Sequence, residues 1–139
     1  MRKNGSLRCE KGEISVTAKI FAAVLILAVI FSVMFFGMSR FVDTVENFIS
    51  QTGDLISAPD ISSGIEAFYE FENDFYENEA FISLFINDSV LEELRIQMVE
   101  IRTAFFNGER DEAVLFTSLL RERFLQIRRS VQPTAVNIF

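Results

Sequence analysis

Carboxylates are the side chains of this 139-residue chain that could do chemistry together. Paired carboxylates can act as general acid and base, and carboxylates on neighbouring helices can hold metal ions. Metal sites in helical bundles usually add His ligands, and this sequence contains no His. We therefore expect no metal, no cofactor and a solvated acidic face on one helix. The six carboxylates concerned are Glu66, Glu70, Glu72, Asp74, Glu77 and Glu79.

The residue types that are missing argue against an enzyme. Without His, neither a Ser-His-Asp nor a Cys-His system can form. Every Lys lies at or before Lys19, which removes Ser-Lys dyads from the remainder of the chain. Gly53, Gly64 and Gly108 stand alone and form no glycine-rich phosphate loop. We expect a protein without catalytic activity.

Aromatic side chains crowd into the acidic segment at helical spacing. Aromatics in such a pattern usually fill a core and only rarely line a ligand-stacking pocket. Tyr69 and Tyr76 lie seven residues apart on a neighbouring stripe, where they should be partly exposed. With Glu70 and Glu77 they make up the predicted interaction surface. The aromatics are Phe68, Tyr69, Phe71, Phe75, Tyr76, Phe81 and Phe85.

An apolar stretch, residues 20–38, predicts where these elements are held. It contains no charge, Ser32 is its one interruption, and it is long enough to cross a bilayer as a helix. Five basic and two acidic residues precede it, whereas eight Arg and eighteen Asp or Glu follow it. Because basic flanks stay in the cytoplasm, we predict a cytoplasmic segment 1–19, a transmembrane helix 20–38 and an extracytoplasmic domain 39–139 in the cell membrane.

A cleaved signal peptide is the alternative, since Gly37, Met38 and Ser39 offer a small-x-small site. The apolar stretch is longer than the ~7 to 15 residues of a usual signal-peptide core, which favours a retained anchor. Cys9 is the only cysteine and lies on the predicted cytoplasmic side, where thiols stay reduced. The outer domain therefore has no disulfide and must rely on its core.

Apolar residues in the outer domain recur every three or four positions, which is typical of amphipathic helices. The first stripe suggests that the membrane helix continues outside until Pro59. We predict an all-α fold in which the transmembrane helix is followed by an antiparallel extracytoplasmic helical bundle. The stripes are Phe41, Val45, Phe48, Thr52 and Leu55; Ile65, Phe68, Phe71 and Phe75; Leu91, Leu94, Met98, Ile101 and Phe105; and Ala113, Phe116, Leu120, Phe124, Ile127 and Val131.

Several local signals predict where the outer helices begin and end. Asn107 and Gly108 tolerate the left-handed conformation found at helix ends, and Pro133 should stop the last helix. Residues 80–86 could extend a helix or form a buried strand, and periodicity does not separate the two. Two capping boxes are predicted at helix starts. They are Ser63 with Glu66, and Ser89 with Glu92.

Charge is unevenly distributed along the outer domain. Residues 41–100 hold fourteen acidic residues and a single Arg, while the last helix ends in a group of arginines. We expect the acidic helix to pack beside that basic end, with modest stabilisation from each exposed pair. A domain this acidic should repel nucleic acid. The arginines are Arg121, Arg123, Arg128 and Arg129.

The C-terminal tail is apolar, which is unusual for a chain end. Leaving Ile138 and Phe139 in water forfeits roughly 1.5 to 3 kcal/mol for each side chain that could be buried. We expect this tail to dock on the domain, with its carboxylate near Arg128 or Arg129. A loose tail, or one that binds a partner, is the alternative.

Several short motifs resemble one bacterial family. The segment EAFISLFIND, the following Leu91, Glu92, Glu93 and Leu94, the later NGERDEAVLF and the terminal Asn-Ile-Phe occur in the same order in the family called domain of unknown function 4363. The resemblance covers most of the chain from about Asp60, and it implies a short membrane-anchored helical protein of a Gram-positive bacterium. Phe75 stands where members often carry Trp, and Asn87 and Asp88 stand where they carry His. The resemblance implies no activity.

Two functions remain open. The favoured one is a membrane-tethered interaction or scaffold module, contacting lipid through residues 20–38 and an unidentified protein through its outer domain. The alternative is a small-ligand sensor, in which a pocket between helices is coupled to the membrane helix. The sequence does not predict an oligomeric state.

Overall fold

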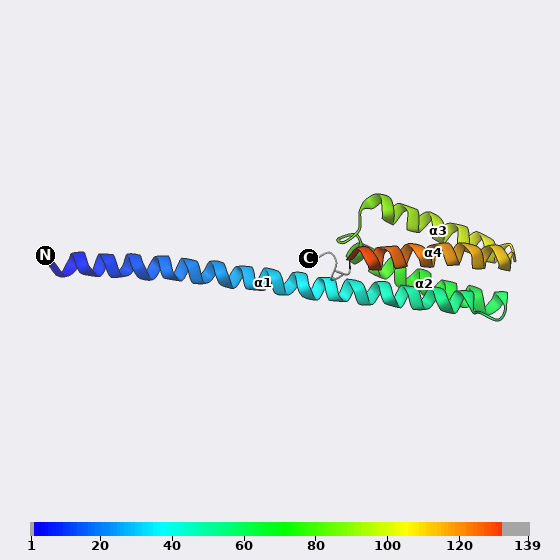
Figure 1. Cartoon of the computed structure of the whole chain (residues 1–139), viewed down its shortest axis with the longest axis horizontal. Helices are drawn as coiled ribbons and strands as arrows, with labels where there is room; N and C mark the ends of the chain where they lie inside the picture. The colour runs from blue at the N-terminus through cyan, green and yellow to red at the C-terminus, as the bar shows by residue number, and fades with distance from the viewer. Residues whose placement is uncertain (1, 132–139) are drawn as a thin grey trace. The chain divides into compact units, whose positions relative to one another are not determined.

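The protein is helical throughout the region that its computed structural model describes, which is residues 2–131, with side chains from residue 15 onward. That region contains four α-helices and no strand: α1 (Arg2–Ile56), α2 (Ile61–Ile82), α3 (Asp88–Phe106) and α4 (Arg110–Val131) (Figure 1). The predicted all-α class is therefore confirmed for this part of the chain. The chain divides into two compact units, Met1–Ser39 and Arg40–Phe139.

The first unit is the N-terminal part of α1. Its large hydrophobic side chains are exposed, from 41% for Met38 to 75% for Phe35. Within the described region, α1 alone is long and apolar enough to cross a membrane. An unbroken helix satisfies its own backbone hydrogen bonds, as a hydrocarbon environment requires. The helix continues to Ile56, as the stripe ahead of Pro59 predicted.

The second unit is an antiparallel helical bundle. It consists of α1 from Arg40 onward together with α2, α3 and α4, and each helix reverses the direction of the one before it (Figure 1). The connections at 57–60, 83–87 and 107–109 are short, and short connections make consecutive helices antiparallel neighbours. The predicted arrangement of helices is thus observed.

Phenylalanine rings fill the centre of the bundle. The Phe48 ring of α1 lies with its centroid 5.7 Å from Phe71 and 5.8 Å from Phe75, both on α2. It also lies 5.4 Å from the ring of Phe124 on α4. These spacings are typical of favourable edge-to-face and tilted aromatic pairs. Because all four rings are buried, they join three helices into one core.

Small residues allow the remaining helices to approach closely. α3 and α4 share the most extensive close contact of the described helices, and the buried Ala104 and Ala113 lie on either side of the turn that joins them. Between α2 and α3, the Phe105 ring packs directly against Gly64, where an added Cβ would lie 2.5 Å from a ring carbon. Helix separation depends on the side chains at the contact, so these positions fix how closely α3 packs.

The predicted stripes agree with the observed core except at a few positions. Every member of the α1 and α3 stripes is buried. On α4, Thr117 is buried as well, because its hydroxyl donates to the carbonyl oxygen of Ala113 at 2.6 Å and leaves no unsatisfied polar group. Three predicted members are only partly buried: Ile65, Phe116 and Val131.

The two predicted capping boxes are wrong, because each helix begins earlier. Asp60 caps α2, and its Oδ1 accepts a hydrogen bond from the Ser63 N–H at 2.7 Å, which lowers the pKa of the Asp60 carboxyl. Asn87 caps α3, and its Oδ1 accepts from the Val90 N–H at 2.9 Å. Asp and Asn are strong N-caps for this reason, and the predicted cap Ser89 instead donates its hydroxyl to Asn87.

The end of α3 agrees with its prediction. Gly108 has φ +71°, a value that L side chains rarely adopt. The Glu109 N–H donates to the carbonyl of Ala104 at 2.9 Å, and the Gly108 N–H donates to that of Phe105 at 3.1 Å. This pair of bonds is the Schellman motif, which satisfies carbonyls left free at a helix end.

Residues 80–86 form no strand. The helix α2 extends through Ile82, and the Ser83 N–H closes its last turn on the carbonyl of Glu79 at 2.9 Å. The chain then turns, with the Phe85 and Ile86 N–H groups both donating to Ile82. Of the two possibilities left open by periodicity, the helix is the one observed.

Candidate interaction surface

The exposed side of α2 and α3 carries side chains suited to binding another protein. Tyr69 and Tyr76 of α2 are 48% and 46% exposed, and Val99 and Phe106 of α3 are 55% and 61% exposed. The Tyr69 ring meets the Phe106 ring edge to face, with centroids 6.3 Å apart. Together with Arg95 and Arg102, these four residues form what we term the α2–α3 face.

Ion pairs hold the two arginines of this face in place. Arg102 binds Glu72 of α2 with two N–H groups, and its Nε lies 3.1 Å from the second carboxylate oxygen. Arg95 binds Glu79 of α2 and also reaches Glu92 of α3 at 3.2 Å. The hydrogen bonds that Arg102 donates to Glu72 raise the pKa of Arg102, and the charge of Glu72 and the nearby Tyr76 and Tyr69 contribute less.

Glu79 acts in the same way on Arg95, because its hydrogen bond raises the pKa of that guanidinium. A two-pronged arginine–carboxylate pair restricts the guanidinium more than a single contact does. The charged groups between the tyrosines and Val99 are therefore preorganised.

A shallow groove adjoins the α2–α3 face. Its volume is about 320 Å³, and it opens beside the Tyr76 ring, between the end of α2 and the start of α3. Arg95 and Glu79 meet in its wall, so the charged groups that line it already engage each other. The groove is lined by Tyr76, Glu79, Ala80, Ser83, Leu91 and Arg95.

The structure separates the four residues of the predicted interaction surface into two pairs. Tyr69 and Tyr76 lie on the α3 side of α2. Glu70 and Glu77 follow them by one residue and so lie about 100° further around the helix. They share that side with Asp74, whose Oδ2 accepts a hydrogen bond from Gln51 Nε2 of α1 at 2.6 Å. Only the tyrosines belong to the α2–α3 face.

The predicted pairing of α2 with the basic end of α4 is wrong. Among the described side chains, the acids of α2 that form ion pairs do so with Arg95 and Arg102 of α3. From α4, Arg123 pairs with Glu93 of α3. The reason is geometric: α3 lies beside both helices, whereas α2 and α4 meet across the core through Phe71 and Phe124.

The carboxylates of α2 are directed to separate neighbours. Glu72 and Glu79 turn to α3, Asp74 turns to α1, and Glu77 accepts a hydrogen bond from Asn73 at 3.3 Å. Within the described region, no group of three potential metal ligands comes together. Through their ion pairs with α3, the carboxylates of α2 can order the α2–α3 face.

Sequence reasoning missed the contribution of α3 to this face. Ile96, Val99, Thr103 and Phe106 step by three, four and three residues, which is a second apolar stripe beside the buried one. Ile96 is 51% exposed, in line with Val99 and Phe106. This second stripe is visible in the sequence. It indicates a binding surface, however, only once the structure shows that the stripe faces outward.

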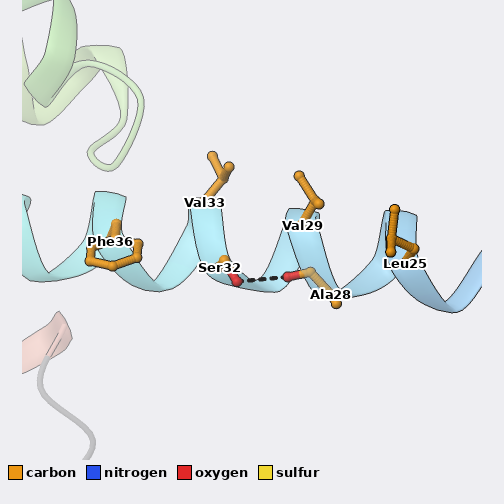
Figure 2. A pocket seen from close by; sticks show the side chains of 6 residues that line it. All are labelled: Leu25, Ala28, Val29, Ser32, Val33 and Phe36. Carbon is orange, nitrogen blue, oxygen red and sulfur yellow. Dashed lines mark hydrogen bonds between the residues drawn. The ribbon is translucent and has the colours of Figure 1, made fainter.

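The apolar part of α1 is the second candidate region. Figure 2 shows a depression on its surface lined by Leu25, Ala28, Val29, Ser32, Val33 and Phe36. The Ser32 hydroxyl donates to the carbonyl of Ala28 at 2.8 Å. The one polar side chain of residues 20–38 is thus satisfied within its own helix, which suits an apolar surrounding.

No protein-family model, curated protein or solved structure matches this chain. The resemblance to domain of unknown function 4363 therefore stays a prediction. The predicted docking of Ile138 and Phe139, and the stop at Pro133, concern residues outside those that the structure describes.

Proposed function

We propose that residues 20–38 anchor the protein in the cell membrane and that its outer domain binds a protein partner through the α2–α3 face. In this proposal residues 1–19 lie in the cytoplasm, the bundle lies outside, and the protein acts by binding without catalysing a reaction. The apolar side chains of residues 20–38 support the anchor, because they are exposed in the folded chain. Removing them from water requires lipid or another apolar partner.

The observation that carries the binding proposal is the composition of the α2–α3 face. Tyr, Arg and Phe are enriched at protein interfaces, and Tyr and Arg are frequent binding hot spots. Tyr69 and Phe106 pack against each other, and Arg102 is held by Glu72. Such a surface loses little side-chain freedom on binding, which favours affinity.

The test is site-specific photo-crosslinking in intact cells. A photoreactive residue at Val99, which is 55% exposed, should yield an adduct of defined mass. Leu115 of α4 is the matched control, since it is an aliphatic residue with 56% exposure outside the face. The adduct at Val99 should disappear when Phe106→Ser is added. Equal adducts at both positions would contradict the proposal.

A ligand sensor is the second candidate, and the groove beside Tyr76 is the observation that favours it. Its volume of about 320 Å³ lies at the lower end of the ~300–1,000 Å³ typical of ligand pockets. A metabolite that binds there should raise the melting temperature of the chain, and Ala80→Leu should abolish the shift. Adducts at Val99 without any ligand-dependent shift would favour the protein partner.

A further inference from the structure

The turn between α2 and α3 exposes an apolar side chain that the α2–α3 face does not explain. Leu84 is 77% exposed, more than any other large hydrophobic side chain in the described region, including those of residues 20–38. Phe81, Phe85 and Ile86 beside it are only partly buried. The turn therefore has an exposed apolar tip, Leu84, and a partly buried apolar base formed by Phe81, Phe85 and Ile86.

Contacts within the bundle fix the level of this turn along α1. The Phe85 ring stacks on Phe41, with centroids 4.7 Å apart and planes 23° from parallel. The Arg40 guanidinium lies 5.4 Å from the centroid of the Phe81 ring. Phe81 and Phe85 in turn meet edge to face at 5.3 Å. The base of the turn is thus level with Arg40 and Phe41.

Chain connectivity puts Arg40 and Phe41 directly after the proposed membrane span. Met38 ends that span, and three helical residues rise only about 4.5 Å. The polar interface on each side of the hydrocarbon core is about 5–8 Å thick. Phe41 therefore lies close to the interface of a bilayer that residues 20–38 cross, and the turn whose Phe85 ring stacks on Phe41 is within reach of that interface.

We propose that the α2–α3 turn inserts Leu84 into the outer lipid interface, where it forms a second membrane contact. This inference rests on the proposed anchor. The proposed contact is apolar and not electrostatic. The outer domain has eight Arg and eighteen acidic residues, so anionic lipid does not attract it. Arg40 supports it, since its guanidinium lies over the Phe81 ring at the base of the turn, where an arginine can keep its charge near the headgroups.

A second contact has a consequence for the α2–α3 face. A single helix leaves the outer domain free to tilt and rotate about the end of the span. A second point of attachment on the turn that joins α2 to α3 restricts that rotation. The α2–α3 face would then point in a fixed direction relative to the membrane.

The absence of Trp from the sequence permits a direct test with the full chain in phosphatidylcholine vesicles. Leu84→Trp introduces a single fluorophore, and Leu115→Trp near the start of α4, at the opposite end of the bundle, is the matched control. Lipids brominated near the top of the acyl chain should quench Leu84→Trp at least twofold more than Leu115→Trp. Equal quenching would overturn the proposal.

Because Trp itself favours interfaces, a second measurement uses a small substitution. In a Cys9→Ser background, Leu84→Cys should react with a membrane-impermeant maleimide at least threefold more slowly in vesicles than Leu115→Cys does. Equal rates would contradict the lipid contact. Protection that is lost when labelled chains are diluted with excess lipid would assign Leu84 to a second copy and would also overturn it.

Failure of the anchor is distinguishable from failure of this inference. If the chain does not float with the vesicles, the proposed membrane span is wrong. If the chain floats while the two tryptophans are quenched equally, the span stands and the lipid contact of Leu84 is refuted.

Discussion

Phe35 and Phe48 lie on the same helix, and their surroundings are opposite. Phe35 is 75% exposed, whereas Phe48 is fully buried among three other phenylalanine rings. Both regions of α1 are apolar, but from Arg40 onward the apolar residues form one stripe, and within 20–38 they occupy every side. A stripe can be covered by three helices of the same chain, while an all-round apolar surface is typical of a helix surrounded by lipid or by other protein.

The largest expected effect comes from placing a charge in either region. Met98→Asp should abolish cooperative melting of residues 40–139, because Met98 is 1% exposed and an unpaired buried carboxylate can cost more than ~4–5 kcal/mol. Circular dichroism of that fragment is the measurement. The matched change, Val29→Asp, should leave the bundle folded and weaken membrane retention by about 2.5–3.5 kcal/mol. Unfolding of the bundle by Val29→Asp would contradict the division of α1 into a part that the bundle needs and a part that it does not.

Removing an aromatic ring should have the next largest effect. Phe48→Ala should cost about 3–5 kcal/mol, because a cavity opens between α1, α2 and α4. Each kcal/mol lowers the melting temperature of a 100-residue domain by roughly 4–8 °C, so a fall of more than about 12 °C is expected. Phe35→Ala in the full chain is the control and should leave the melting of the bundle unchanged.

Two glycines of the bundle differ in the space available for an added methyl group. Gly64→Ala should destabilise the bundle by about 1–3 kcal/mol, because the new Cβ would lie 2.5 Å from the buried Phe105 ring. Gly53→Ala has nothing within 4 Å of its Cβ and should stabilise by up to about 1 kcal/mol. Chemical denaturation of both variants measures the difference, and similar values for the two would contradict the described packing of Phe105.

A smaller effect tests where α3 begins. Asn87→Ala should cost ~1 kcal/mol, because it removes the oxygen that accepts from the Val90 N–H. Ser89→Ala should cost clearly less, since Ser89 lies inside the helix. The reverse order in thermal melts would restore the capping box that the sequence predicted.

The smallest effect concerns the solvated start of α4. Glu109 raises the pKa of Glu112 above its ordinary value, because the protonated Glu112 carboxyl can donate a hydrogen bond to Glu109 and the two carboxylates repel each other when both are ionised. The stability that this contact provides is present at low pH and is lost as pH rises through the raised pKa. Glu112→Gln should therefore raise the melting temperature at pH 7 and have little effect at pH 4. Glu100→Gln on the exposed side of α3 is the control, and a pH-independent effect of Glu112→Gln would contradict the pairing.

Helical periodicity predicted the fold because each helix of the bundle carries an apolar stripe that is wholly or mostly buried. Leu91 to Phe105 could be placed without knowing any partner, since the pattern depends only on one helix. The helix starts could not be placed in this way. Asp60 and Asn87 compete with nearby Ser residues as N-caps, and which residue caps the helix depends on where packing begins. The charge pairing failed for a similar reason, as it requires knowledge of which helices are neighbours.

The candidate surface was predicted only in part. Tyr69 and Tyr76 were identified because their stripe is offset from the buried phenylalanines. Val99 and Phe106 were not, because exposure of a second apolar stripe depends on tertiary packing. Leu84 was assigned to an apolar run of helix or strand, and only the turn at Ser83 shows that its side chain leaves the core.

The most direct test of the proposed membrane topology compares thiol labelling at the two ends of α1 in intact cells. The native chain, with its single thiol at Cys9, and a Cys9→Ser/Ser57→Cys variant are treated with a membrane-impermeant maleimide, and membranes are then collected. We predict that both chains remain in the membrane fraction, that the thiol introduced at position 57 is labelled in intact cells, and that Cys9 is labelled only after lysis. Labelling of Cys9 before lysis, or recovery of a soluble chain that begins near Arg40, would contradict the proposal that residues 20–38 separate a cytoplasmic segment from an outer helical domain.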